Sequence, residues 1–119
     1  MLLEDYNGFC ASPPHATHVV QWGGAHVWKV GGKVFAIGGS REEGRLAVSF
    51  KCSEMSYDLL KEQPGLRPAP YLASRGMEWI QRQTDQAMDD ATLREYLAES
   101  HRLVSAGLPK TLKRELGLL

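Results

Sequence analysis

Residues 26–37, which read HVWKVGGKVFAI, decide the fold. Two runs rich in β-branched and aromatic residues flank the pair Gly31-Gly32. A two-residue turn of type I′ needs a positive φ at both of its positions, and glycine adopts that conformation without steric cost. The pattern therefore predicts an antiparallel β-hairpin with strands over His26–Val30 and Lys33–Ile37.

More strands are predicted on both sides of this hairpin. His18–Trp22 is a short strand ended by Gly23-Gly24, and Arg45–Cys52 is a strand whose apolar residues alternate with small or charged ones. Met77–Arg82 is a last strand, with which Tyr71–Ala73 could pair. The intervening residues 38–44 are predicted to form an exposed loop. Residues 66–76 are predicted to be a loop or a weak edge strand, because they contain two prolines.

Helices are predicted before, between and after these strands. Residues 2–11 form a short helix that the pair Pro13-Pro14 ends. Ser53 caps a helix over 54–62, with Met55, Leu59 and Leu60 on its inner side. Asp89 or Asp90 caps the strongest helix, about 90–106, and Ser100 lies within its apolar stripe. Residues 109–116 add a basic helical turn or two.

This order of elements predicts the fold class. Strands joined by hairpins are antiparallel, and three helices suffice to cover one side of a sheet. We therefore expect an α+β two-layer sandwich, in which an antiparallel sheet of about five strands carries helices packed on one face. Residues 1–119 are expected to form one domain, because this length is usual for a single core.

Composition narrows the class of protein. Fourteen basic residues balance fourteen acidic ones, so no global charge attracts nucleic acid or a membrane. Cys10 and Cys52 are far apart and have no metal or redox spacing, and two reduced thiols are a simpler interpretation than one disulfide. The first residues lack the pattern of a signal peptide, and no apolar run is long enough to span a bilayer. We expect a cytoplasmic protein.

Motifs for catalysis or cofactors are missing from the sequence. There is no nucleophile elbow and no phosphate-binding glycine loop, so we expect no enzyme activity and no cofactor. The three histidines His15, His18 and His26 lie close together, but a metal site usually adds a carboxylate or a thiolate. Histidines on an exposed loop are the simpler interpretation.

The charges are distributed unevenly along the chain. Residues 15–53 hold five basic residues and two acidic ones, whereas residues 83–106 hold two basic and five acidic. If Lys29 and Lys51 share one face of the sheet, lysines cross its open side, bordered by Arg67, Arg75 and Trp79. Cations beside an aromatic ring suit a nucleic-acid backbone and stacked bases. The alternative is a solvated face whose lysines prevent edge aggregation, with the tryptophans in the core.

Residues 29–104 resemble the MmcQ/YjbR family of small bacterial proteins. The resemblance rests on an ordered set: Lys29–Ala36, Leu46–Cys52, Pro64-Gly65, Arg67-Pro68, Tyr71, Trp79-Ile80, Ser100 and Leu103-Val104. His101 stands where the resemblance leads us to expect tyrosine, and Arg75 stands near an expected lysine. The resemblance implies a fold like that of CyaY/frataxin and secretion chaperones, and the family often carries a DNA-binding label.

Three hypotheses about function follow. The first is a DNA-binding module that uses Lys29, Lys33, Lys51, Arg67 and Arg75 as phosphate contacts, with Trp79 beside them. The second is a protein-interaction or chaperone-like adaptor that offers the open side of the sheet to a protein partner. The third is a small-ligand or metal-binding protein that uses His15, His18 and His26.

Overall fold

The computed structural model describes residues 1–40, 46–70, 72 and 76–119. Its six strands form one antiparallel sheet in the order β1-β2-β3-β4-β6-β5. The strands are β1 (Ala16–Gln21), β2 (Ala25–Val30), β3 (Lys33–Ser40), β4 (Leu46–Lys51), β5 (Leu66–Pro68) and β6 (Trp79–Arg82). The helices are α1 (Leu3–Ala11), α2 (Glu54–Leu60), α3 (Asp90–Ala106) and α4 (Lys110–Glu115).

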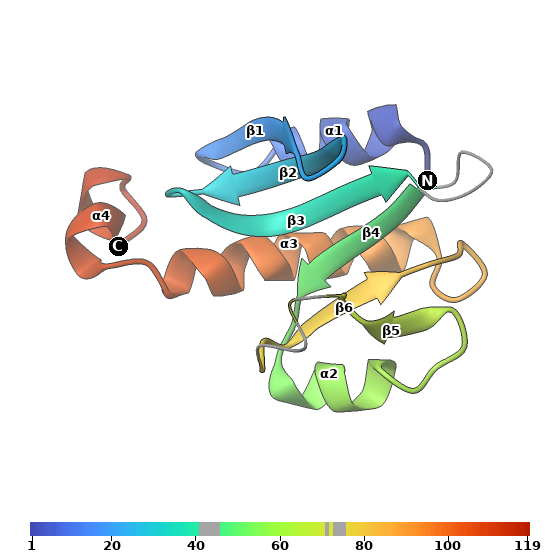
Figure 1. Ribbon diagram of the computed structural model, residues 1–119. Helices are drawn as coiled ribbons and strands as arrows, with labels where there is room; N and C mark the ends of the chain where they lie inside the picture. The colour runs from blue at the N-terminus through green and yellow to red at the C-terminus, as the bar shows by residue number, and fades with distance from the viewer. Residues whose placement is uncertain (41–45, 71, 73–75) are drawn as a thin grey trace.

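The helices pack on one side of this sheet. Figure 1 shows α3 running behind the central strands, with α1 behind the β1–β2 end. We call this side the helix-side face and the opposite side, which looks toward the viewer in Figure 1, the outer face. The predicted two-layer α+β sandwich is confirmed, with six strands rather than about five.

The central hairpin is confirmed. Gly31 and Gly32 have φ values of 57° and 79°, as the type I′ turn requires. A β-bulge lies where β2 and β3 shift register after Trp28. Beyond the hairpin, the predicted loop over residues 38–44 is wrong at its start, because β3 continues to Ser40. Residues 41–44 lie outside the described residues.

A buried serine satisfies the backbone beside the bulge. The Ser100 hydroxyl donates to the Phe35 carbonyl at 2.6 Å and accepts from the Lys51 amide at 2.9 Å. These two bonds tie α3 to β3 and β4, and the serine is fully buried. The polar residue in the apolar stripe of α3 is therefore a structural bridge between helix and sheet.

Both predicted helix caps are confirmed, but the predicted packing of α2 is wrong. Ser53 and Asp89 cap α2 and α3 by accepting the amides of Ser56 and Thr92. However, Met55 and Leu59 are 75% and 65% exposed, so their predicted inner position is wrong. The helix α2 has only seven residues and lies beside the edge strand β5 and its neighbour β6, where it buries Leu60.

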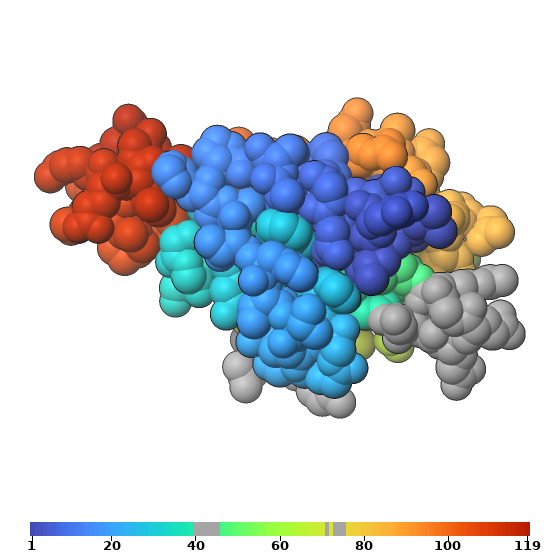
Figure 2. All heavy atoms as spheres, turned by 90° about the horizontal axis from the view of Figure 1, so that it is seen from above, coloured from blue at the N-terminus to red at the C-terminus, as the bar shows by residue number. Residues whose placement is uncertain are grey.

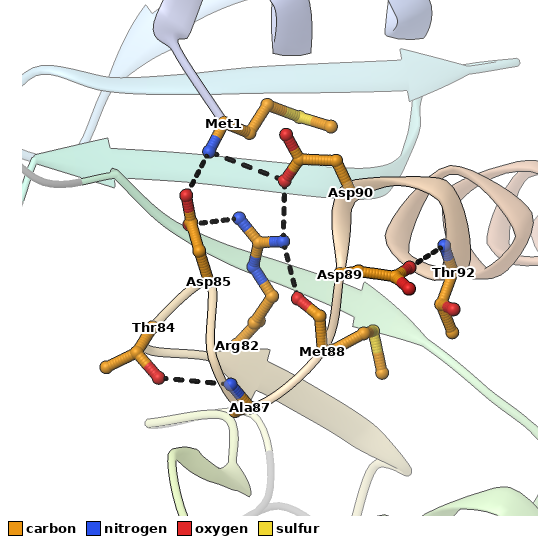
Figure 3. Close-up of polar contacts among 9 residues, drawn as sticks. All are labelled: Met1, Arg82, Thr84, Asp85, Ala87, Met88, Asp89, Asp90 and Thr92. Carbon is orange, nitrogen blue, oxygen red and sulfur yellow. Dashed lines mark hydrogen bonds and ion pairs between the residues drawn. The ribbon is translucent and has the colours of Figure 1, made fainter.

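A buried arginine closes the loop between β6 and α3 (Figure 3). The Arg82 guanidinium donates to the Met88 carbonyl and to the carboxylates of Asp85 and Asp90, at 2.7–2.9 Å. Hydrogen bonding to Arg82 lowers the pKa of Asp90. Because Arg82 is fully buried on the helix-side face, these bonds fix the start of α3 against the sheet.

Candidate binding face

One row of side chains crosses the outer face along the strand register. Val19 of β1 pairs with Val27, which pairs with Ile37 of β3, and the pairing continues through β4 and β6 to β5. The last three members of the row are Ser49, Gln81 and Arg67. No helix covers this face in Figure 1, as the two-layer prediction requires.

A hollow of about 730 Å³ lies over the middle of this row. Ala25, Ile37, Ser49 and Gln81 come from four neighbouring strands and form its floor. Its walls come from the β1–β2 turn on one side and from the chain after β5 on the other. The wall residues are Trp22, Ala69, Pro70 and Leu72. The lining is mainly apolar, with one hydroxyl and one amide in the floor.

Trp22 is the exposed aromatic of this face. Trp22 is 62% exposed and has a φ of 53°, and the two glycines that follow it also have positive φ values. A bulky residue in the left-handed region costs about 1–2 kcal/mol. Backbone strain of this kind is commonly found at functional sites. The expectation that tryptophans lie in the core holds for Trp28 and Trp79 and is wrong for Trp22.

The register places three of the predicted cations on the outer face. Lys29 lies two residues after Val27, and Lys51 lies two residues after Ser49, so both share the face of this row. Both lie toward the same end of the sheet and are partly exposed. Arg67 closes the row at the β5 edge, where its Nε donates to Gln81 Oε1 at 2.8 Å. No ion pair is found between these three residues and a carboxylate of the described chain.

The remaining predicted site residues add no exposed side chain to the described outer face. Lys33 pairs with Val30 at the hairpin turn, so its side chain lies on the helix-side face. Trp79 is on the outer face but only 2% exposed, so its ring is a packing residue there. Arg75 lies outside the described residues, as do Tyr71 and Ala73 of the predicted short strand.

The six strands contain no acidic residue at all. They hold five basic ones, namely Lys29, Lys33, Lys51, Arg67 and Arg82. The described carboxylates belong to helices, their caps and the connections between elements. The predicted basic sheet is therefore present in the structure, whereas α3 itself carries three acidic and two basic residues.

The three histidines of the third hypothesis do not converge on one site. His18 Nε2 lies 3.0 Å from His26 Nδ1, and both rings lie near the Asn7 and Trp28 side chains. Because Trp28 donates to the Asn7 oxygen, the Asn7 amide nitrogen faces His26 Nδ1, which must accept. Within the described ranges no group of three metal-ligating side chains converges, and His15 is exposed.

The two cysteines are free, buried thiols, as predicted. Burial raises the pKa of Cys10 to about 12 and that of Cys52 to about 11. Since the thiolate is the reactive form, neither side chain is an activated nucleophile.

Comparison with known proteins identifies the family. The YjbR family model matches residues 11–103, so the chain belongs to the YjbR family. No curated protein matches it. A crystal structure of the Deinococcus radiodurans protein DR2400, which has a DUF419 domain, superposes with a TM-score of 0.81 at 22% identity, covering 99% of this chain and 89% of that one.

This structural likeness concerns the fold alone.

His101 stands where the family resemblance led us to expect tyrosine. Its ring packs edge-on against Phe35, and its Nε2 donates to the Pro14 carbonyl at 2.9 Å. Among the described residues, no helix combines the length and apolarity needed to cross a bilayer.

Proposed function

We propose that this protein binds nucleic acid through the outer face of its sheet. The observation that carries the proposal is the charge pattern: none of the six described strands contains an acid, and Lys29, Lys51 and Arg67 lie on the face that no described helix covers. Such cations attract phosphates and are not neutralised by carboxylates within the described chain. In this function the chain is a binding protein and not an enzyme.

Three phosphate contacts set the strength of this binding. Each contact releases a counterion, so log K falls against log salt with a slope of about −2 to −3. The side chains position a phosphate backbone and read no base edge. The expected interaction is therefore weak at physiological salt and strong only at low salt.

Charge reversal tests the proposal. Lys29→Glu and Lys51→Glu should each weaken oligonucleotide binding and reduce the salt slope by about 1 or more. Lys33→Glu is the matched control, because this lysine belongs to the same hairpin but lies on the other face. The measurement is fluorescence anisotropy of a labelled DNA at several salt concentrations. Absence of binding at low salt, or equal losses in all three variants, would refute the proposal.

A second candidate function, a protein-interaction adaptor, is favoured by the edge strand β1. Its six residues, ATHVVQ, carry no Lys, Arg, Asp or Glu, and Val19 and Val20 are exposed. Figure 2 looks down on this edge and shows the β1 residues at the surface. An uncharged open edge can accept a strand from a partner. A pull-down that survives nuclease treatment would support this function, and recovery of nucleic acid alone would count against it.

A further inference from the structure

The hollow on the outer face offers no cation to a phosphate, because its lining is mainly apolar and contains no charged residue. Two of the outer-face cations lie beside it: Lys51 follows the floor residue Ser49 by two positions, and Arg67 is bonded to the floor residue Gln81. A ligand for the whole surface must therefore combine negative charge with a flat apolar part. A nucleotide released from a duplex has both.

We infer that this hollow accepts one unstacked base of a single-stranded nucleic acid, with Trp22 as the stacking surface. The inference rests on the proposed function and adds a preference for single strands. Trp22 projects from the β1–β2 turn into one wall, while Pro70 and Leu72 form the other. The volume of about 730 Å³ is within the range of small-molecule sites.

The floor supplies polar groups for a base edge. Since Arg67 donates to Gln81 Oε1, the part of that amide without a hydrogen-bond partner among the described residues is its NH₂ group. The Ser49 hydroxyl beside it can donate or accept. Carbonyl oxygens of a base match these donors. In a duplex the bases are paired and stacked, so only a single strand can present one to this hollow.

The experiment compares three probes of equal length: a single-stranded oligothymidylate, an abasic strand with the same number of phosphates, and a duplex. We expect the thymidylate to bind about 5- to 150-fold more tightly than the abasic strand, which is the usual contribution of a stacked base. It should also quench the fluorescence of the exposed Trp22, whereas Trp28 and Trp79 are buried.

Two variants locate the effect. Trp22→Gly should erase the difference between thymidylate and abasic strands. It should not lower the melting temperature, because glycine adopts the φ of this position freely. Leu72→Ala, in the opposite wall, should reduce the difference. Met55→Ala is the control, since this exposed apolar side chain belongs to α2.

The outcomes separate the inference from the proposed function. Equal binding of all three probes without quenching would overturn the base site and leave phosphate binding in place. Binding of no probe at low salt would overturn both. Quenching by an apolar peptide and by no oligonucleotide would assign the hollow to a protein partner, and would also overturn the inference.

Discussion

The helix-side face and the outer face of the same sheet carry side chains of different sizes. The first is filled with large residues such as Phe35, Phe50 and Ile80, all fully buried. The second has small residues at several positions of its strands, among them Ala25, Gly39, Ala47 and Ser49, beside larger ones such as Ile37 and Trp79. Large residues meet the helices and leave no space, whereas small residues leave the hollow.

This difference predicts where substitutions affect stability and where they affect binding. A tightly packed face transmits any change in volume or hydrogen bonding to the fold. Exposed positions of the outer face, such as Arg67, tolerate change because their groups are hydrated, whereas Val27, Ser49 and Trp79 of the same face are buried. Matched pairs of variants, one on each side of this contrast, test it directly.

The largest effect on stability is expected at the buried arginine, Arg82. Arg82→Met removes a buried guanidinium that bonds to two carboxylates and one carbonyl, so the free energy of unfolding should fall by about 3–5 kcal/mol. Arg67→Met, on the exposed outer side of the neighbouring strand, should change it by less than about 0.5 kcal/mol. Urea unfolding followed by circular dichroism measures both. A similar cost for the two variants would contradict the contrast between the faces.

The next effect concerns the contact between α3 and the sheet. Ser100→Ala leaves the Phe35 carbonyl and the Lys51 amide without their partner, which should cost about 2–4 kcal/mol. Ser105→Ala is the control on the same helix, because the buried hydroxyl of Ser105 has no hydrogen-bond partner among the described residues. Its unfolding free energy should stay within about 0.5 kcal/mol of the parent protein. Equal losses would show that Ser100 contributes through helix propensity and not through its bridge.

The sequence predicts the helix-side face better than the outer face. Alternation of apolar residues over 46–52 and the glycine pair at 31–32 report local backbone preference, and both predictions are confirmed. The partners of Arg82 depend on where the loop before α3 returns, which no local pattern encodes. The outer placement of Lys29 and Lys51 required the register of three strands, including the bulge after Trp28.

The hollow escaped prediction for a related reason. Its lining comes from five separate segments of the chain, and small residues in a strand give no signal of a concave surface. Trp22 offered the one usable hint, because a tryptophan directly before Gly23-Gly24 lies in a turn and not in a packed strand. Helical spacing also led to a wrong prediction for Met55 and Leu59. They were expected to be buried, but the short helix α2 leaves both side chains exposed.

The smallest effect comes from two adjacent glycines of β3 that face opposite sides. A Cβ at Gly38 would lie 2.6 Å from the ring of Tyr6, which is buried and donates to the His26 carbonyl. The ring cannot move away, so Gly38→Ala should cost about 1–3 kcal/mol. A Cβ at Gly39 meets no atom of the described residues within 4 Å. Gly39→Ala should be neutral or stabilise by about 0.5–1 kcal/mol, because alanine restricts the unfolded chain.

Thermal unfolding of the two single variants and of the double variant decides this prediction. Since one side chain packs against Tyr6 and the other points to open space, the two effects should add to within about 0.5 kcal/mol. A destabilised Gly39→Ala would mean that the outer face is packed as tightly as the helix-side face. In that case the hollow beside it could not admit a ligand without a rearrangement of the sheet.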